Sequence, residues 1–180
     1  RDFLSALTKL LEKNYVVYKN GLLYLTERGI RYCKENNILG CKSYSCNLCD
    51  GRTINLDSAP FSVREKFSEI QKNRPGNDLQ FDQGYVTPEV SLARCYFSMG
   101  KGDVQGKSIL FLGDDDLTSI AMAFATPYKR IVVFDIDPKI VDFINNVARR
   151  ENLKNFSAHI YNVKEDLPEK FCKAFDTFFY

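Results

Sequence analysis

Three consecutive aspartates, Asp114, Asp115 and Asp116, follow a single glycine in the middle of the chain. They come directly after a short apolar run at 108–112, of the kind that a strand covered on both faces shows, and before a helical pattern at 117–125. Open α/β sheets bind ligands at the carboxyl ends of their strands. Because adjacent anions repel one another, the sequence favours a functional explanation for these carboxylates over a solvated run of charge.

Polar residues also follow the next two predicted strands, at 130–134 and 156–161. Asp135 comes 22 residues after Gly113, close to the spacing at which nucleotide-binding α/β folds place an acid that binds the ribose hydroxyls. Asn162 follows the third strand and is either a hydrogen-bonding partner for an adenine edge or a plain turn residue. These positions together indicate a nucleoside site at one edge of a sheet.

The turn after the first strand lacks the glycine-rich pattern of a dinucleotide site. Its carboxylates would repel a pyrophosphate by ~1 kcal/mol per charge pair in water, and by more in a drier site. This argues against NAD and FAD and favours a cationic sulfonium nucleoside of the S-adenosylmethionine type. The decarboxylated form, which has no α-carboxylate, suits an acidic site best. A cationic acceptor such as a polyamine suits it too, and its neutral nitrogen would be the nucleophile.

Strands alternate with helices from residue 107 onward, which is typical of a doubly wound parallel sheet. A helix is expected at 138–151 and a fourth strand from Phe175 to Tyr180. Upstream, a helix at 89–99 begins with Pro88 at its first position. We therefore expect the α/β fold class, with a Rossmann-like, methyltransferase-type domain at 81–180.

The first part of the chain has a different pattern. A helix at 2–14, a hairpin around Asn20-Gly21 and a helix at 27–36 that Thr26 begins are similar to the last part of a winged-helix domain. We expect a winged-helix-like domain with a cysteine loop at 1–57, followed at 58–80 by a linker helix and a turn.

Charge and hydropathy limit the possible partners. The net charge is +2, with +3 on residues 1–58 and −1 on residues 59–180, which is too little for a DNA-binding stripe. A docking or dimerisation role, as in a homodimer, is therefore expected instead of nucleic-acid binding. No apolar run approaches the ~20 residues of a membrane helix, and no signal peptide is recognised. The sequence predicts a cytoplasmic protein.

Six cysteines in a cytoplasmic protein indicate thiols or metal ligands before disulfides. Cys46 and Cys49, separated by two residues and followed by Asp50-Gly51, form half of a zinc-ribbon pattern that Cys41 and Cys33 could complete. A structural zinc and free thiols both remain open. Cys95 and Cys172 lie in apolar surroundings and are expected in the core. The single histidine, His159, lies inside an apolar strand and is expected to be structural.

Three segments resemble the branched-chain polyamine synthases, that is, the N4-bis(aminopropyl)spermidine synthases. They are GDDDLTS at 113–119, VVFDIDP at 132–138 and DQGYVTPE at 82–89. The resemblance covers the whole chain. It implies transfer of an aminopropyl group from decarboxylated S-adenosylmethionine to the secondary amine of spermidine, with methylthioadenosine as the second product. It also implies that the three aspartates of the first segment, Asp114–Asp116, line the sulfonium and amine site.

The resemblance further implies that Asp135 holds the ribose and that Asp137 lies near the adenosine. Gln83 and Tyr85 would belong to a segment that folds over the cofactor, or to a loop packed on the sheet. The expected cofactor-binding residues are thus Gln83, Tyr85, Gly113, Asp135, Asp137 and Asn162.

Members of that family carry an Asp-Pro-Pro-Tyr-like motif after the fourth strand, where this chain ends. We therefore expect a domain truncated on its C-terminal side. Two other functions stay open at this point. One is an S-adenosylmethionine-dependent methyltransferase acting on nucleic acid or protein, and the other is a non-catalytic DNA-binding regulator that senses a nucleoside.

Overall fold

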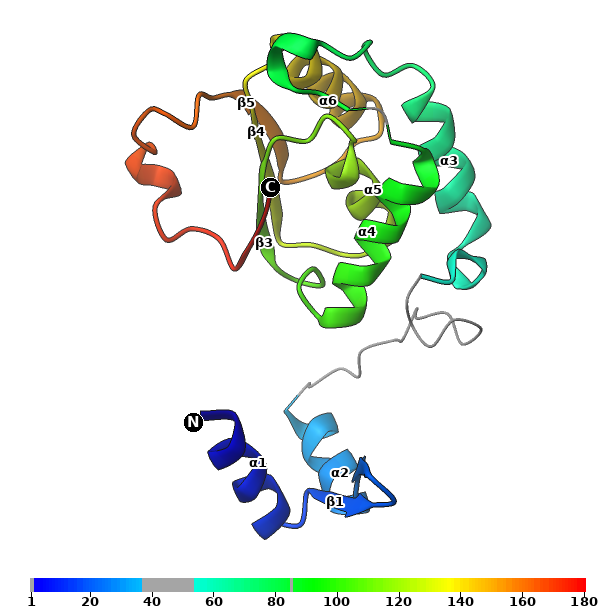
Figure 1. The fold of residues 1–180 in the computed structure, drawn as a ribbon, viewed down its shortest axis with the longest axis vertical. Coiled ribbons are helices and arrows are strands. Elements are labelled where there is room, and N and C mark those ends of the chain that lie inside the picture. The colour runs from blue at the N-terminus through cyan, green and yellow to red at the C-terminus, as the bar shows by residue number, and fades with distance from the viewer. Residues whose placement is uncertain (1, 37–53, 85) are drawn as a thin grey trace. The chain divides into compact units, whose positions relative to one another are not determined.

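The computed structural model describes residues 2–36, 54–84 and 86–180 of the chain (Figure 1). The contacts within the chain divide it into two compact units, residues 1–40 and residues 41–180. This division differs from the expected domain boundaries near residues 57 and 80. The difference arises because the helix expected as a linker packs inside the second unit.

The first unit consists of a helix, a two-stranded antiparallel hairpin and a second helix. These are α1 (Asp2–Glu12), β1 (Val16–Lys19), β2 (Leu22–Leu25) and α2 (Glu27–Glu35). The predicted hairpin is confirmed, with Asn20 and Gly21 both at positive φ in its two-residue loop, as the twist of a tight hairpin requires. The predicted cap of α2 is also confirmed, because the Gly29 N–H donates to the Thr26 hydroxyl at 3.0 Å.

The second unit is built on a parallel four-stranded sheet, which confirms the expected α/β class. Its strands are β3 (Ser108–Leu112), β4 (Arg130–Asp135), β5 (Phe156–Ile160) and β6 (Thr177–Phe179), in the order β5-β4-β3-β6. The chain leaves β3 toward β4 and β5 and then returns to the other side of β3. This reversal makes the carboxyl ends of β3 and β6 a topological switch point, where sheets of this kind bind ligands.

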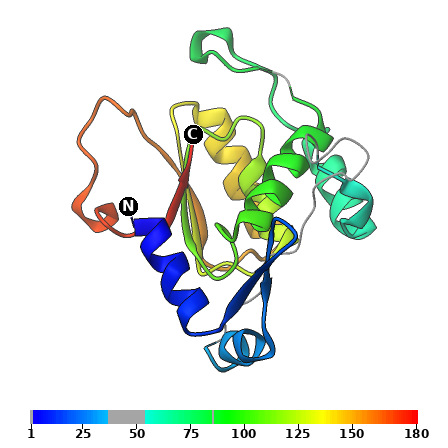
Figure 2. The ribbon, with the colours of Figure 1, turned by 60° about the horizontal axis from the view of Figure 1, so that its bottom comes forward.

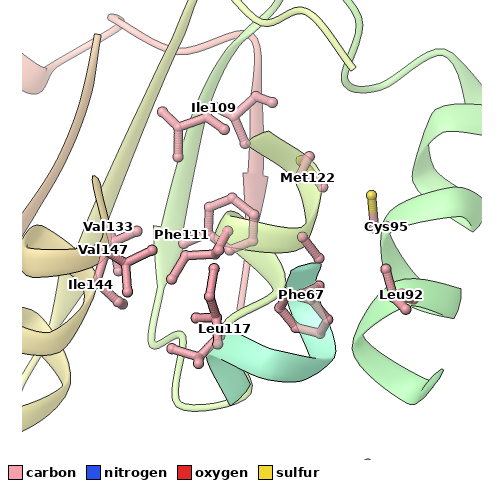
Figure 3. Close-up of a cluster of buried hydrophobic side chains, with 14 of the residues drawn as sticks. Phe67, Leu92, Cys95, Ile109, Phe111, Leu117, Met122, Val133, Ile144 and Val147 are labelled. Carbon is pink, nitrogen blue, oxygen red and sulfur yellow. The ribbon is translucent and has the colours of Figure 1, made fainter. Parts of the chain in front are cut away.

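Four helices cover one face of this sheet (Figure 1). They are α3 (Phe61–Gln71), α4 (Pro88–Lys101), α5 (Thr118–Ala125) and α6 (Pro138–Arg150). Figure 3 shows Phe67 of α3 and Leu92 of α4 facing the strands, with Phe111 of β3 and Met122 of α5 in the same cluster. Cys95 is fully buried there, as predicted. This packing fixes β3, and therefore the acidic turn that follows it.

The other face of the sheet is covered by residues 161–176, which include the short 3₁₀ helix η4 (Glu169–Phe171). Phe171 is buried against Phe134, whereas Cys172 is exposed. The prediction that Cys172 lies in the core is therefore wrong, since the neighbouring phenylalanine is the side chain that turns inward. His159 packs edge-on against Phe134, with ring centroids 6.0 Å apart, and burial lowers its pKa. Both observations fit a structural role for the histidine.

Two further 3₁₀ helices lie upstream of the sheet, η2 (Leu56–Ser58) and η3 (Leu79–Phe81). The helix predicted from residue 58 therefore begins at Phe61, after Pro60. In the parts of the chain that the structure describes, no helix combines the length and the apolar character needed to cross a bilayer.

Candidate active site

The turn after β3 has two residues in the left-handed region. Gly113 has φ +79° and donates its N–H to the Phe134 carbonyl at 2.7 Å, and Leu117 has φ +59°. A β-carbon on Gly113 would meet nothing within 4 Å, so the glycine faces open space. The left-handed turn sends the three aspartates between these residues in different directions.

Asp114 points into the protein and is 2% exposed. Its carboxylate accepts from the Ser119 N–H at 3.1 Å and also from the Ser119 hydroxyl. Burial raises the pKa of Asp114 well above its ordinary value, and the charge of Asp116 adds to the rise. Asp114 is thus a buried cap of α5, and its charge is disfavoured.

Asp116 caps the same helix from the other side. Its carboxylate accepts from the Thr118 N–H at 3.2 Å and from the Thr118 hydroxyl at 3.0 Å, and Arg94 of α4 pairs with it. Asp114 and Asp116 therefore satisfy early N–H groups of α5 and lie at its positive end. Two of the three aspartates therefore have a structural role, whereas the sequence favoured a functional explanation for the whole run.

Asp115 is the aspartate that keeps access to solvent, with 33% of its side chain exposed. Arg74 donates to its backbone carbonyl and, at 3.3 Å, to its carboxylate. Burial and the charge of Asp116 raise the pKa of Asp115, while Arg74 opposes them. Asp115 is therefore a partly open, charge-balanced carboxylate at the end of β3.

A cavity of about 530 Å³ opens at the switch point, and we name it the β6-side cavity. Its wall combines carboxylates, one guanidinium and aromatic rings. The lining residues are Arg94, Phe97, Ser98, Phe111, Leu112, Gly113, Asp114, Asp115, Asp116, Thr118, Phe179 and Tyr180. Such a wall suits an alkyl chain that carries positive charge, because rings contact methylene groups and attract cations.

A second cavity of about 250 Å³, the β4-side cavity, lies across the turn at the ends of β4 and β5. It is lined by Phe81, Asp82, Gln83, Leu112, Gly113, Asp115, Phe134, Asp135, Ile136, Tyr161 and Val163. Leu112, Gly113 and Asp115 line both cavities. The two cavities therefore share a wall, and Asp115 is the titratable group in that wall.

Asp135 connects the β4-side cavity to the turn after β3. Its carboxylate accepts from the Asp114 N–H and from the Asp137 N–H, both at 2.9 Å. A carboxylate has about four lone-pair sites, so two backbone bonds leave acceptor capacity toward the cavity. The group can hold the backbone and still bind a pair of ligand hydroxyls.

Asp137 and Gln83 form a buried link beside the same cavity. Asp137 is fully buried and caps α6, since its carboxylate accepts from the Lys139 N–H at 2.8 Å. The Gln83 amide donates to Asp137 at 2.8 Å and accepts from the Asp78 N–H at 2.9 Å. Gln83 lines the β4-side cavity and Asp137 does not, so Asp137 acts through Gln83.

Residues 62–180 match the family model described as "Branched-chain polyamine synthase A C-terminal domain". The chain belongs to the branched-chain polyamine synthase family. The N(4)-bis(aminopropyl)spermidine synthase of Methanocaldococcus jannaschii is 42% identical over 170 residues, which make up 94% of this chain and 48% of the relative. That of Thermus thermophilus is 44% identical over 135 residues, 75% of this chain and 39% of the relative.

A solved structure gives the same result. The branched-chain polyamine synthase from Thermus thermophilus, in complex with N4-aminopropylspermidine and 5'-methylthioadenosine, aligns with a TM-score of 0.67 and 36% identity. The alignment covers 95% of this chain and 47% of that one. The chain thus spans just under half the length of the curated and solved family members with which more than nine-tenths of it aligns.

Some expected residues of the polyamine synthase site lie elsewhere or outside the described chain. The Asn162 side chain accepts from the Lys164 N–H at 3.0 Å in a local turn, and its neighbours Tyr161 and Val163 line the β4-side cavity instead. Tyr85 lies outside the described residues, as do the three proposed zinc ligands, Cys41, Cys46 and Cys49. Their roles stay predictions. Among described residues, no group of three or more His, Cys, Asp or Glu side chains could hold a metal ion.

Sequence reasoning missed several residues that line the two cavities or contact the acidic turn. Tyr161 could have been predicted, because it ends the predicted third strand and sheets of this kind bind ligands at the carboxyl ends of their strands. It packs against Phe134 with ring centroids 4.7 Å apart. Arg74 and Arg94 carry no local signal, since they lie 41 and 22 residues from the aspartates they contact. Only the packing of α3 and α4 brings them to the turn.

The buried state of Asp114 predicts a specific pH dependence of stability. Because its folded pKa is raised, folding favours the protonated form. Stability is therefore lost as the pH rises from the unfolded pKa near ~4 through the folded value. Asp114→Asn removes this loss, since an amide can accept from the Ser119 N–H and donate to the Ser119 hydroxyl. Urea unfolding from pH 4 to pH 8 should show the variant gaining stability relative to the parent as the pH rises. An unchanged difference across that range would contradict a raised pKa.

Proposed function

We propose that the chain supplies the nucleoside-binding half of an aminopropyltransferase of this family. The enzyme would move the aminopropyl group of decarboxylated S-adenosylmethionine to the secondary amine of spermidine, giving a branched polyamine and methylthioadenosine. The observation that carries the proposal is the wall of Leu112, Gly113 and Asp115 shared by two cavities of different character. The relative from Thermus thermophilus, solved with a branched polyamine and methylthioadenosine, supports the same assignment.

In this proposal the nucleoside occupies the β4-side cavity. Asp135 accepts hydrogen bonds from the ribose hydroxyls, as the acid after the second strand does in related α/β folds. Phe134, Ile136 and Tyr161 offer apolar and aromatic surface to the adenine ring. Gln83, held by Asp137, closes the cavity from the side. The role of Asn162 is then to stabilise the local turn that places Tyr161 and Val163 in the wall of the β4-side cavity.

The polyamine occupies the β6-side cavity. Phe97 and Phe179 contact its methylene groups and ammonium charges, and Asp115 faces its central nitrogen across the shared wall. Gly113 has no side chain, and the space beside it is open. The two substrates can therefore contact each other across this position. Asp116 is balanced by Arg94 and Asp114 is buried, so the acidity of the cavity is weaker than three free carboxylates would give.

The reaction forms one bond and breaks one. The secondary amine nitrogen attacks the methylene carbon next to the sulfonium. The carbon–sulfur bond breaks, and its electron pair stays on sulfur as neutral methylthioadenosine. The nitrogen must first be neutral, so its ammonium form gives one proton to the Asp115 carboxylate, and the attack then leaves the product nitrogen as a tertiary ammonium. The partly open, ionisable Asp115 is the residue placed to accept it.

A product assay tests this function. Full-length protein is incubated with spermidine and either decarboxylated or ordinary S-adenosylmethionine, and the products are analysed by mass spectrometry. We expect aminopropylated spermidine and methylthioadenosine with the decarboxylated donor alone. Methylated product from the ordinary donor would replace this proposal with a methyltransferase, because the α-carboxylate would then be accepted beside the acidic turn.

We further propose that the first unit is the end of a winged-helix domain that serves docking or a homodimer of a cytoplasmic enzyme. The order α1-β1-β2-α2 supports this, as does the exposure of every residue of β2, Leu22–Leu25. Light scattering on the full-length protein tests it. A monomeric mass at all concentrations would contradict the homodimer.

A further inference from the structure

Arg74 is a largely buried cation whose side chain contacts the turn after β3. Its side chain is 9% exposed. Its Nε–H donates to the Asp115 carbonyl, one terminal nitrogen reaches the Asp115 carboxylate at 3.3 Å, and the other donates to the Pro75 carbonyl at 2.9 Å. A planar guanidinium with five donors is suited to binding two acceptors of one residue at once. Arg74 therefore holds both the backbone and the side chain of Asp115.

The segment of chain that carries Arg74 is anchored in the core. It follows α3, which is anchored in the core by Phe67 and Ile70, exposed by 0% and 4%. The Arg74 N–H closes a turn after α3 by donating to the Gln71 carbonyl at 3.1 Å, and Pro75 restricts the backbone of Arg74, the residue before it. Figure 2 places the chain segment of η3, just beyond Pro75, on the side of the sheet to which the carboxyl end of β6 points. The buried end of α3 thus fixes the place from which the guanidinium reaches the turn.

The three aspartates differ in how they are held. Asp114 and Asp116 each bind a hydroxyl residue of α5, Ser119 and Thr118 respectively. Among the described residues, the side chain that hydrogen-bonds the Asp115 carboxylate is Arg74. A paired buried arginine is by itself weak evidence for stability, because desolvation offsets the attraction. A role in the site explains why a cation is buried at this aspartate.

We propose that Arg74 is a positioning residue of the transfer reaction, fixing Asp115 so that its open carboxylate surface faces the point where the two cavities meet. The inference rests on the proposed function, in which Asp115 accepts the proton of the attacking amine. Arg74 does not line either cavity that Asp115 joins, so it acts through Asp115 and not on the substrates.

The surroundings of Asp115 give the inference a measurable consequence. The charged groups around it are Asp114, Asp116, Asp135, Asp82, Arg94 and Arg74. Burial, Asp116 and Asp135 raise its pKa, whereas Arg74 and the Gly84 N–H lower it. Removing Arg74 therefore raises the pKa of Asp115 further. The ionised form that accepts a proton would then appear only at higher pH.

The experiment compares Arg74→Gln, Arg74→Lys and Lys72→Gln in the full-length protein. Lys72 is a matched control, because it lies two residues away, carries the same charge and makes an exposed ion pair with Glu69. The pH profile of kcat and the KM for both substrates are measured. We expect Arg74→Gln to lower kcat by roughly 10- to 100-fold, to move the acidic limb of the profile to higher pH, and to leave the KM for the nucleoside within about twofold. Arg74→Lys keeps the positive charge but lacks the planar guanidinium that binds two acceptors at once. We therefore expect the acidic limb of its pH profile to coincide with that of the parent, and its kcat to lie between those of the parent and Arg74→Gln.

Several outcomes separate the possibilities. If the Arg74→Gln profile superimposes on that of Lys72→Gln, the positioning role is wrong. If Arg74→Gln does not fold, as judged by circular dichroism, the test depends on Arg74→Lys. A kcat equal to that of the parent in Arg74→Lys would then show that the guanidinium is not needed to position Asp115. Asp115→Asn is assayed in parallel. Full activity in that variant would sink the role of Asp115 in the proposed function, whereas an inactive Asp115→Asn beside a fully active Arg74→Gln would sink the present inference only.

Discussion

Asp115→Asn will stop aminopropyl transfer while leaving the protein folded and able to bind methylthioadenosine. The amide keeps the size of the side chain and can still accept from Arg74 through its oxygen, but it cannot take a proton from the attacking amine. Loss of a general base typically lowers the rate by roughly 10²- to 10⁴-fold. Mass-spectrometric detection of branched polyamine measures the rate, and calorimetry with methylthioadenosine measures binding.

Asp142→Asn is the matched control for this variant. Asp142 is an exposed aspartate on α6, away from both cavities, and its neutralisation should leave the rate unchanged. A tenfold smaller rate in both variants would point to a general effect of charge. A rate for Asp115→Asn within twofold of the parent would show that another group accepts the proton.

Asp135→Ala will lower both the affinity for methylthioadenosine and the stability of the second unit. The substitution leaves the N–H groups of Asp114 and Asp137 without their acceptor in a buried place, since Asp135 is 6% exposed. Each unsatisfied buried donor costs roughly 1–3 kcal/mol, so we expect the two together to cost roughly 2–6 kcal/mol. Urea unfolding measures the stability, and calorimetry measures the affinity.

Two comparisons separate these effects of Asp135. Asp135→Asn keeps one acceptor oxygen but turns a donor toward the second N–H, so its stability should fall between those of the parent and the alanine variant. Asp142→Ala, on the exposed side of α6, should change neither quantity. If Asp135→Ala lost stability but bound methylthioadenosine at the parent's affinity, Asp135 would be a structural residue only.

The acidic turn itself shows how far local sequence can lead. Its position, between an apolar strand and a helix at the edge of a parallel sheet, followed from residue types and spacing. In the sequence the three aspartates cannot be told apart, because they are identical residues in one short turn and the sequence does not show which groups each of them contacts. In the folded chain the left-handed conformations of Gly113 and Leu117 separate them into two helix caps and one open carboxylate.

The sequence by itself determined the α/β order of elements, the hairpin at Asn20-Gly21 and the place of the acidic turn after β3, because hydrophobic periodicity and turn chemistry act over a few residues. The tertiary structure alone decided which carboxylate is open and what holds it. The link from Arg74 to Asp115 spans 41 residues, and that from Gln83 to Asp137 spans 54. No local pattern specifies such pairs, since they arise only when α3 and the segment after it pack beside the carboxyl ends of the strands.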